Sequence, residues 1–218
     1  MKRVLEPEVM DDEEQAEAYA LADFSSSNQM FVDGFWADCD RDCANVLDLG
    51  CGPADIPIRM VQARPSVHVT AVDASDAMLG AAAKAVRQAG LTQQITLVKG
   101  RLPGLSLADA KFDAIVSKDL LHHLPDPLVF WEEAKRLARG RPRVYVMDLF
   151  RPQSKQDARD IVESVSAGEP EILKSDFYNS LLAAFTVEEI EEQLRRANLD
   201  LEVRTVSERH MLIRGVLE

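Results

Sequence analysis

The sequence has few cysteines and no long apolar run. Its three cysteines, Cys39, Cys43 and Cys51, form an odd and sparse set, which argues against the disulfide framework of a secreted protein. No segment approaches the roughly 18 apolar residues of a membrane helix. The start, MKRVLEPEVMDDEE, lacks the apolar stretch of a signal peptide. We therefore expect a reduced, cytoplasmic protein without a membrane anchor.

Basic residues are also scarce, because 25 Lys and Arg stand against 37 Asp and Glu, a formal net charge of −12. Such an acidic surface repels phosphate groups, so we expect no broad nucleic-acid interface and no polybasic attachment to anionic lipid. In contrast, 218 residues with 46% hydrophobic and 28% charged residues suffice for a full-sized globular core. The sequence carries no signal for an oligomeric state.

Apolar segments of strand length alternate with segments of helical periodicity. The expected strands are 45–49, 67–73, 95–100, 112–117 and 143–150, followed by a hairpin of 201–207 and 210–216. Helices are expected over 76–89 after an N-cap at Ser75, over 127–139, and after Thr186 in a capping box with Glu189. This alternation predicts an α/β fold: a Rossmann-like, seven-stranded, mostly parallel sheet with helices on both faces and an antiparallel C-terminal hairpin.

Two stretches stand outside this alternation. Residues 1–44 precede the first expected strand and contain two helical patterns, 11–24 and 26–39. Residues 151–185 follow the fifth strand and are longer than an ordinary connection. We expect a single domain overall, with 45–218 as its core, 151–185 as a lid insertion and 1–44 as an N-terminal helical lid segment.

The most informative segment is VLDLGCGPADIPI, in which a buried strand runs into Gly50-Cys51-Gly52 and then into a helix. Glycines at such a turn let the backbone approach a ligand, and the free N–H groups at the helix start attract electron-rich atoms. A dinucleotide site has a third glycine where Asp55 stands, and the Asp55 carboxylate would repel a pyrophosphate. A ligand with an amine or a ribose and without phosphate fits better.

Asp73 ends the second expected strand, in VTAVDAS. A carboxylate at that strand end can accept hydrogen bonds from two ribose hydroxyls. An isolated aspartate after a strand is more often a cap, but the glycine turn that precedes it in the chain favours the ribose interpretation.

Three segments in this order resemble the class I S-adenosylmethionine-dependent methyltransferases, over roughly residues 44–150. VLDLGCG is similar to the family's first motif, VTAVDASDAML to its ribose-binding second motif, and FDAIVSKDLLHHLPDP to the segment at its fourth strand. The last string is similar to the small-molecule branch that includes ubiquinone-type methyltransferases. The resemblance implies S-adenosylmethionine as cofactor, S-adenosylhomocysteine as product and a small-molecule acceptor.

The resemblance also implies which residues bind the cofactor: the glycine turn around the methionine portion, Asp73 at the ribose, and the residues after the fourth strand at the sulfonium. With residues of the N-terminal helices that close over the cofactor or else belong to the core, the set is Asp48, Gly50, Cys51, Gly52, Asp73, Ala74, Met78, Gly100, Arg101, Leu102, Lys118, Asp119, Leu120, Tyr19 and Phe24.

One position departs from the family pattern, which often has Gly-Asp after the third strand, where the carboxylate accepts from the adenine amino group. Here the pair is Gly100-Arg101. Arginine cannot accept a hydrogen bond. Adenine recognition must then use backbone groups or another side chain, or the pocket has been turned to another use.

Methyl transfer from a sulfonium is an in-line displacement that depends on alignment and exclusion of water. A base is needed only when the acceptor arrives protonated, and the candidates are Asp119, His122 and His123, which alternatively hold the loop. Tyr178 is a further catalytic candidate. Tyr178 and Asn179 either contact the substrate from the lid or pack within it.

Arg151 lies at the end of the fifth strand, where it either binds an anionic group of the substrate or pairs with a surface acid. Cys39 and Cys43 are four residues apart and are expected to share a helix face. Since no histidine is near them, we predict no metal site.

Three other functions stay open on the sequence. The first is an enzyme of the same fold that uses the cofactor for another reaction. The second is a non-catalytic binding protein that keeps the cofactor pocket. The third, a nicotinamide-dependent oxidoreductase, is disfavoured by the missing third glycine and by the lack of a Tyr-x-x-x-Lys pair.

Overall fold

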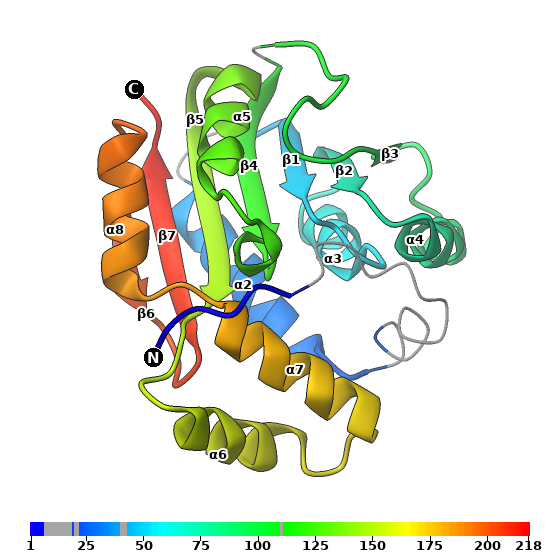
Figure 1. Cartoon of the computed structure of the whole chain (residues 1–218). Coiled ribbons are helices and arrows are strands. Elements are labelled where there is room, and N and C mark those ends of the chain that lie inside the picture. The colour runs from blue at the N-terminus through cyan, green and yellow to red at the C-terminus, as the bar shows by residue number, and fades with distance from the viewer. Residues whose placement is uncertain (7–18, 20–21, 40–42, 110) are drawn as a thin grey trace.

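The computed structural model describes residues 1–6, 19, 22–39, 43–109 and 111–218. Its centre is a seven-stranded sheet in the order β3-β2-β1-β4-β5-β7-β6 (Figure 1). The strands are β1 (Asn45–Leu49), β2 (His68–Asp73), β3 (Ile95–Lys99), β4 (Phe112–Lys118), β5 (Ala138–Leu149), β6 (Glu202–Thr205) and β7 (His210–Val216). Only β7 runs antiparallel to its neighbours β5 and β6 in this described sheet. The predicted sheet and hairpin are confirmed.

Helices cover both faces of the sheet. They are α2 (Ser25–Asp38), α3 (Asp55–Ala63), α4 (Asp76–Gln88), α5 (Leu128–Leu137), α6 (Lys155–Ser166), α7 (Glu171–Ala183) and α8 (Val187–Arg196). Alternate strand residues point to opposite faces, so Val46 packs against α2, α3 and α4, whereas Leu47 and Leu49 pack against α5 and α8. None of the described helices has the length and apolar character to cross a bilayer.

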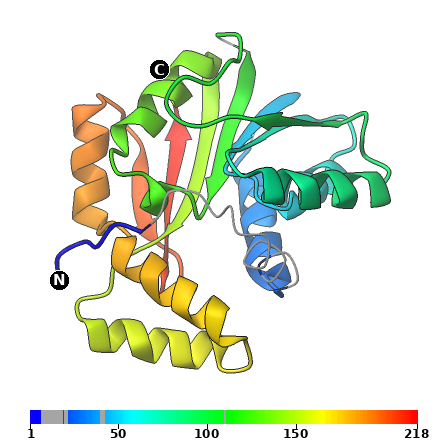
Figure 2. The ribbon, with the colours of Figure 1, turned by 45° about the vertical axis from the view of Figure 1, so that its right-hand side comes forward.

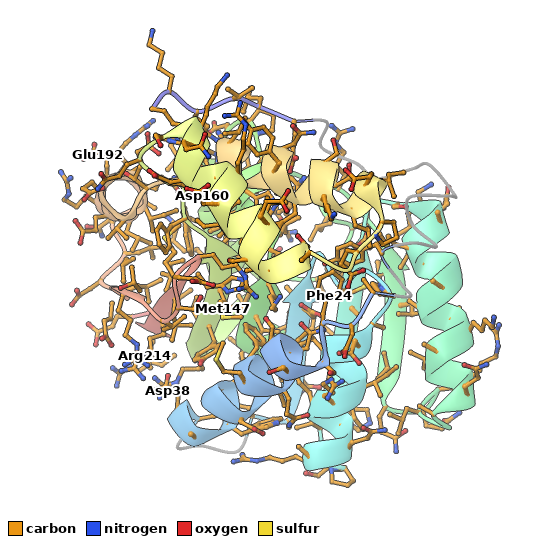
Figure 3. All side chains as sticks on the ribbon, turned by 90° about the horizontal axis from the view of Figure 1, so that it is seen from below. Phe24, Asp38, Met147, Asp160, Glu192 and Arg214 are labelled. Atoms are coloured by element: carbon orange, nitrogen blue, oxygen red, sulfur yellow. A yellow bond between two sulfur atoms is a disulfide. The ribbon has the colours of Figure 1, made fainter. Side chains whose placement is uncertain are left out.

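Helices α6 and α7 lie outside these layers, across the carboxyl ends of the parallel strands (Figures 1 and 2). Ala158 and Val162 of α6 pack on Leu181 and Leu182 of α7. The view from below shows both helices in front of the sheet, with Phe24 near the start of α2 (Figure 3). The inserted segment 151–185 is therefore a helix pair at the end of the sheet where ligands bind in such folds.

The N-terminal residues run along this helix pair. Val4 N donates to Leu182 O at 3.0 Å, and the Met1 ammonium group donates to Gln153 O at 3.2 Å. The helical pattern predicted over 26–39 is confirmed as α2. The pattern over 11–24 falls largely outside the described residues.

Two boundaries at α5 and β5 differ from the prediction. The helix expected over 127–139 ends at Leu137, and β5 begins at once with Ala138 rather than at residue 143. Ala138 already pairs with Phe112 of β4, and the register then shifts before Arg143 pairs with Ala114. Strand pairing with β4 therefore ends the helix before its sequence periodicity does.

The prediction that Cys39 and Cys43 share a helix face is wrong. Helix α2 ends at Asp38, so Cys39 and Cys43 share no helix face, and the two are joined in a disulfide. Asp38 Oδ1 accepts from Arg214 Nη1 of β7 at 2.8 Å, and this pair holds the end of α2 against the sheet (Figure 3). Cys51 is a free thiol and is buried.

The predicted capping box at Thr186 is confirmed, with Glu189 N 3.3 Å from Thr186 Oγ1 and Thr186 N 3.0 Å from Glu189 Oε2. Thr186→Ala leaves an N–H group at the start of α8 without its acceptor, which costs about 1 kcal/mol. We expect a melting temperature lower by about 2–4 °C in a chain of this size. Thr186→Ser keeps the oxygen and is the matched control. Equal losses in both variants, measured by circular dichroism, would contradict the cap.

Candidate active site

The turn after β1 brings the backbone close to the start of α3. Gly50 and Cys51 donate their N–H groups to Val72 O of β2, at 2.9 and 3.0 Å. Gly50 has a φ of +76°, and a Cβ on it would lie 3.0 Å from the Leu120 side chain. A side chain here would strain the backbone and meet Leu120, so this turn requires glycine.

Asp73 connects this turn to the end of β2. Its Oδ2 accepts the N–H of Gly52 at 2.8 Å, and its Oδ1 accepts the N–H of Ser75 at 2.9 Å. Burial raises the pKa of Asp73, although these N–H groups favour the ionised form. A carboxylate offers about four acceptor sites, so Asp73 holds the turn and can still bind a ligand.

Asp48 is a buried carboxylate with an oxygen that lacks a hydrogen-bond partner among the described residues. The residue is 2% exposed, and its Oδ2 has no hydrogen-bond partner among the described residues. Burial, together with the charge of Asp73, raises the pKa of Asp48 to about 8. A cationic group bound at Asp48 would offset the cost of burying this carboxylate.

Three cavities meet at the carboxyl end of the sheet. The main cavity, of about 1070 Å³, lies over the glycine turn and α4. The small cavity, of about 130 Å³, lies beside Asp73, and the lid cavity, of about 440 Å³, lies against α6 and α7. Tyr19, Lys118 and Asp119 line all three cavities, so they form the junction between them.

Every residue that the sequence analysis assigned to the cofactor lines the main or the small cavity. Around the main cavity are Asp48, Gly50, Cys51, Gly52, Lys118, Asp119, Tyr19 and Phe24. Around the small cavity are Asp73, Ala74, Met78, Gly100, Arg101, Leu102 and Leu120. Asp55, at the place of the missing third glycine, is paired with Arg59 Nε at 2.7 Å and with Asn28 Nδ2 at 2.8 Å.

His122 lies at the buried edge of the lid cavity, and Asp148 orients its ring. Nδ1 of His122 is 2.6 Å from Asp148 Oδ1, and Asp148 Oδ2 accepts the Leu121 N–H at 2.6 Å. Burial lowers the pKa of His122, but the attractions of Asp148, Glu6 and Asp119 together outweigh it, so the net shift is upward. The carboxylate fixes the ring with Nε2 facing Glu6, whose Oε1 is 3.5 Å away.

Asp119 occupies the junction with a left-handed backbone, at a φ of +57°. Lys118 forms an ion pair with it, and His210 Nε2 lies 3.7 Å from its Oδ1. Burial opposes ionisation of Asp119, but the charges of Lys118 and His210 exceed that effect and lower its pKa to about 2. Asp119 is thus a fixed negative charge near neutral pH, which makes it a poor proton acceptor.

Arg151, predicted to touch the substrate, lines none of the cavities found in the described part of the chain. Its Nη1 donates to Ala184 O at 2.9 Å and its Nη2 to Glu189 Oε1 at 2.6 Å. This is the alternative that the sequence left open, in which Arg151 pairs with an acid. It fixes the start of α8 to the end of β5.

Tyr178 and Asn179 also lie away from the described cavities. Tyr178 packs towards α6, with the Arg159 guanidinium 5.9 Å from its ring centre, and Asn179 is exposed. The side of α7 that lines the lid cavity carries Leu173, Asp176, Phe177 and Ser180. Their spacing is that of one helix face, so sequence reasoning chose the correct helix and the wrong face.

Three residues near the lid cavity escaped the sequence analysis. Arg209 and His210 reach it from the turn before β7, and Glu6 lies beside His122 and His123. Helical periodicity within α7 was a signal for Asp176 and Phe177. No local pattern signals Glu6 or His210, because only the fold brings them to the end of β4.

The comparisons with known proteins agree with this geometry. Residues 46–141 match the family of methyltransferase domains. The chain is 30% identical over 114 residues to a demethylmenaquinone methyltransferase of Bacillus velezensis, covering 52% of this chain and 48% of that one. It is 27% identical over 160 residues to the 27-O-demethylrifamycin SV methyltransferase of Amycolatopsis mediterranei, covering 72% and 54%. The chain thus spans about half the length of the curated relatives it matches.

Solved structures share the fold over almost the whole chain. A methyltransferase from Aquifex aeolicus superposes with a TM-score of 0.72 at 19% identity, covering 94% of this chain and 98% of that one. The plantazolicin methyltransferase BamL, solved with S-adenosylhomocysteine, gives 0.74 at 13% identity, covering 94% and 90%. The fold is that of the class I S-adenosylmethionine-dependent methyltransferases. The match to the methyltransferase domain at residues 46–141 covers this fold from β1 to the start of β5.

The raised pKa of Asp48 gives a pH-dependent stability. Between its ordinary pKa of 3.8 and the folded value of about 8, the folded protein retains a proton that the unfolded chain releases. Asp48 therefore destabilises the ligand-free fold increasingly as pH rises across that window. We expect the melting temperature of Asp48→Asn, relative to the unsubstituted chain, to be higher at about pH 8.5 than at about pH 5. A difference that is independent of pH would contradict this.

Proposed function

We propose that this chain is an S-adenosylmethionine-dependent methyltransferase that transfers a methyl group to a small-molecule acceptor. The observation that carries the proposal is the junction of three cavities at Tyr19, Lys118 and Asp119. A cofactor in the main and small cavities and an acceptor in the lid cavity would meet at this junction. An in-line displacement needs such a meeting point, shielded from water.

The residues around the main and small cavities fit the cofactor. Asp48 has a buried carboxylate oxygen without a partner among the described residues, which suits an ammonium group. Asp73 has acceptor sites for ribose hydroxyls. Asp119 adds negative charge at the junction, which favours a cation there. When bound, S-adenosylmethionine supplies a methyl group on a positively charged sulfur.

Adenine would be bound in the small cavity without the usual acidic residue. Arg101 is exposed, and the walls include the side chains of Met78, Leu102, Leu105 and Leu124. Apolar walls suit the faces of a flat base. Packing and backbone groups therefore replace the missing carboxylate in our proposal.

The lid cavity would hold the acceptor. Its volume of about 440 Å³ falls in the range of small-ligand sites. Leu149, Leu173 and Phe177 give it an apolar side, whereas His122 and Asp176 give it a polar edge. We therefore propose a largely apolar acceptor with its nucleophilic atom at the His122 edge, covered by the segment 151–185 as a lid.

Cofactor binding is tested by thermal melting with S-adenosylhomocysteine and with NADH as comparator. A ligand at 100 times its dissociation constant adds about 2.7 kcal/mol, which corresponds to a shift of several degrees. We expect a shift with S-adenosylhomocysteine alone and its loss in Asp73→Asn. Asp200→Asn, which changes an exposed acid that lines none of the three cavities, is the matched control and should keep the shift. No shift in the unsubstituted chain at millimolar ligand would rule out the proposal.

The acceptor site is tested by S-adenosylhomocysteine release from S-adenosylmethionine with a panel of hydroxylated aromatic and polyketide-like acceptors. We expect Phe177→Ala to raise the acceptor KM roughly tenfold or more, because it removes an apolar wall of the lid cavity. Tyr178→Ala, on the other face of α7, should leave that KM within about twofold. A larger rise in the acceptor KM in Tyr178→Ala than in Phe177→Ala would contradict the placement of Phe177 in the wall of the lid cavity. Binding of S-adenosylhomocysteine with no turnover of any acceptor would favour a non-catalytic binding protein.

A further inference from the structure

Three metal-ligating side chains converge beside the lid cavity. Glu6 comes from the N-terminal segment, and His122 and His123 from the short 3-10 helix η1 (Leu121–His123). Glu6 Oε1 lies 3.0 Å from His123 Nδ1 and 3.5 Å from His122 Nε2. Two ligands bonded to one ion at about 2.1 Å, with an angle of 90–110°, are themselves about 3.0–3.4 Å apart. Both distances lie in or next to that range.

The ion pair of Glu6 and His123 is close but lacks the geometry of a hydrogen bond donated by His123 Nδ1. His123 Nδ1 is buried and has no hydrogen-bond partner among the described residues, although Glu6 Oε1 is 3.0 Å away. A hydrogen bond points along the line from donor to acceptor, whereas two ligands of one ion both point to a position beside that line. The separation of Glu6 Oε1 and His123 Nδ1 is that of two ligands of one ion.

Two of the three ligands, His122 and Glu6, are also held by other residues. Asp148 Oδ1 lies 2.6 Å from His122 Nδ1, which leaves Nε2 as the ligating atom, as in carboxylate–histidine–metal triads. Ser180 Oγ donates to Glu6 Oε1 at 3.1 Å. Arg3 Nη2 donates to His122 O at 2.8 Å, and so joins the N-terminal segment to η1. His122 and Glu6 are thus held in place before an ion binds.

We propose that Glu6, His122 and His123 bind a divalent transition-metal ion. Two imidazole nitrogens and one carboxylate suit Zn²⁺, Fe²⁺, Mn²⁺ or Co²⁺ better than Mg²⁺ or Ca²⁺, which prefer oxygen ligands. Three protein ligands leave at least one coordination position open. The side chains of His122 and Glu6 are only 3% and 10% exposed, and both histidines line the lid cavity, so the open position faces that cavity.

The ion would bind the methyl acceptor, and this role rests on the proposed function, whereas the binding site itself does not. An acceptor hydroxyl that takes the open position releases its proton to solvent, because the ion lowers the hydroxyl pKa. The oxygen lone pair then forms the O–CH₃ bond while the S–CH₃ bond breaks. The electrons of that bond stay on sulfur, giving neutral S-adenosylhomocysteine. In this mechanism His122 is a ligand rather than the general base.

The site is tested by calorimetric titration of the chelator-treated chain with Zn²⁺, in the absence of cofactor and acceptor. We expect one Zn²⁺ per chain, and visible absorption from Co²⁺ bound at the same site. Glu6→Gln and His123→Asn should weaken Zn²⁺ binding by more than about 100-fold, and Asp148→Asn by about 10–100-fold. Glu169→Gln, which removes an acid of the same cavity outside the cluster, is the matched control and should bind Zn²⁺ unchanged.

The proposal is overturned by the lack of stoichiometric Zn²⁺ binding up to roughly 100 µM, an affinity weaker than specific sites provide. It is also overturned by equal affinities in the unsubstituted chain, Glu6→Gln and His123→Asn. Circular dichroism checks that the variants fold, and if Glu6→Gln does not, His123→Asn and Asp148→Asn decide in the same way. Zn²⁺ binding without S-adenosylhomocysteine binding would keep the metal site and reject methyl transfer. Binding of S-adenosylhomocysteine without binding of Zn²⁺ would reject only the metal site.

Discussion

The site depends on the carboxylate of Asp73, which joins the ends of two strands. It accepts the N–H of Gly52 in the turn after β1 and the N–H of Ser75 at the start of α4. Together with the bonds from Gly50 and Cys51 to Val72 O, these contacts hold a backbone of left-handed residues against the neighbouring strand. The main and small cavities lie on either side of this connection, so their shapes follow from it.

The same connection concentrates negative charge. Asp48 is buried beside the half-buried Asp73, and burial together with the charge of Asp73 raises the pKa of Asp48 to about 8. Lys118 forms an ion pair with the third carboxylate, Asp119, whereas no cationic side chain pairs with Asp48 among the described residues. A cationic ligand would remove this destabilisation. The ligand-free fold is therefore less stable than its packing allows, as expected where a binding site is prepared in advance.

Much of the fold follows from local sequence patterns. Apart from the start of β5, the strands, the cap at Ser75 and the capping box at Thr186 are specified by short segments and are found where they are predicted. The end of α5 was misplaced because pairing with β4, a distant segment, takes over at Ala138. The Cys39–Cys43 pair was misjudged because four-residue spacing places two side chains on one face only within a helix, and α2 ends at Asp38, before both cysteines.

The site was predictable to a different degree on its two sides. The cofactor side is built from motifs at strand ends, where position in sequence determines position in space, and its predicted residues line the two cavities. The acceptor side is assembled from α7, the turn before β7 and the N-terminal segment. Whether Phe177 or Tyr178 faces the cavity depends on the docking of α7, which no motif encodes. Glu6 reaches His122 only through long-range packing.

The most direct test of the account is a crystal structure of the chain with S-adenosylhomocysteine. We predict the ammonium group beside Asp48, the ribose hydroxyls on the Asp73 carboxylate, and the sulfur at the junction of Tyr19, Lys118 and Asp119. In that position the sulfur faces the lid cavity. A ligand with its ribose away from Asp73, or with its sulfur directed away from the lid cavity, would contradict the account.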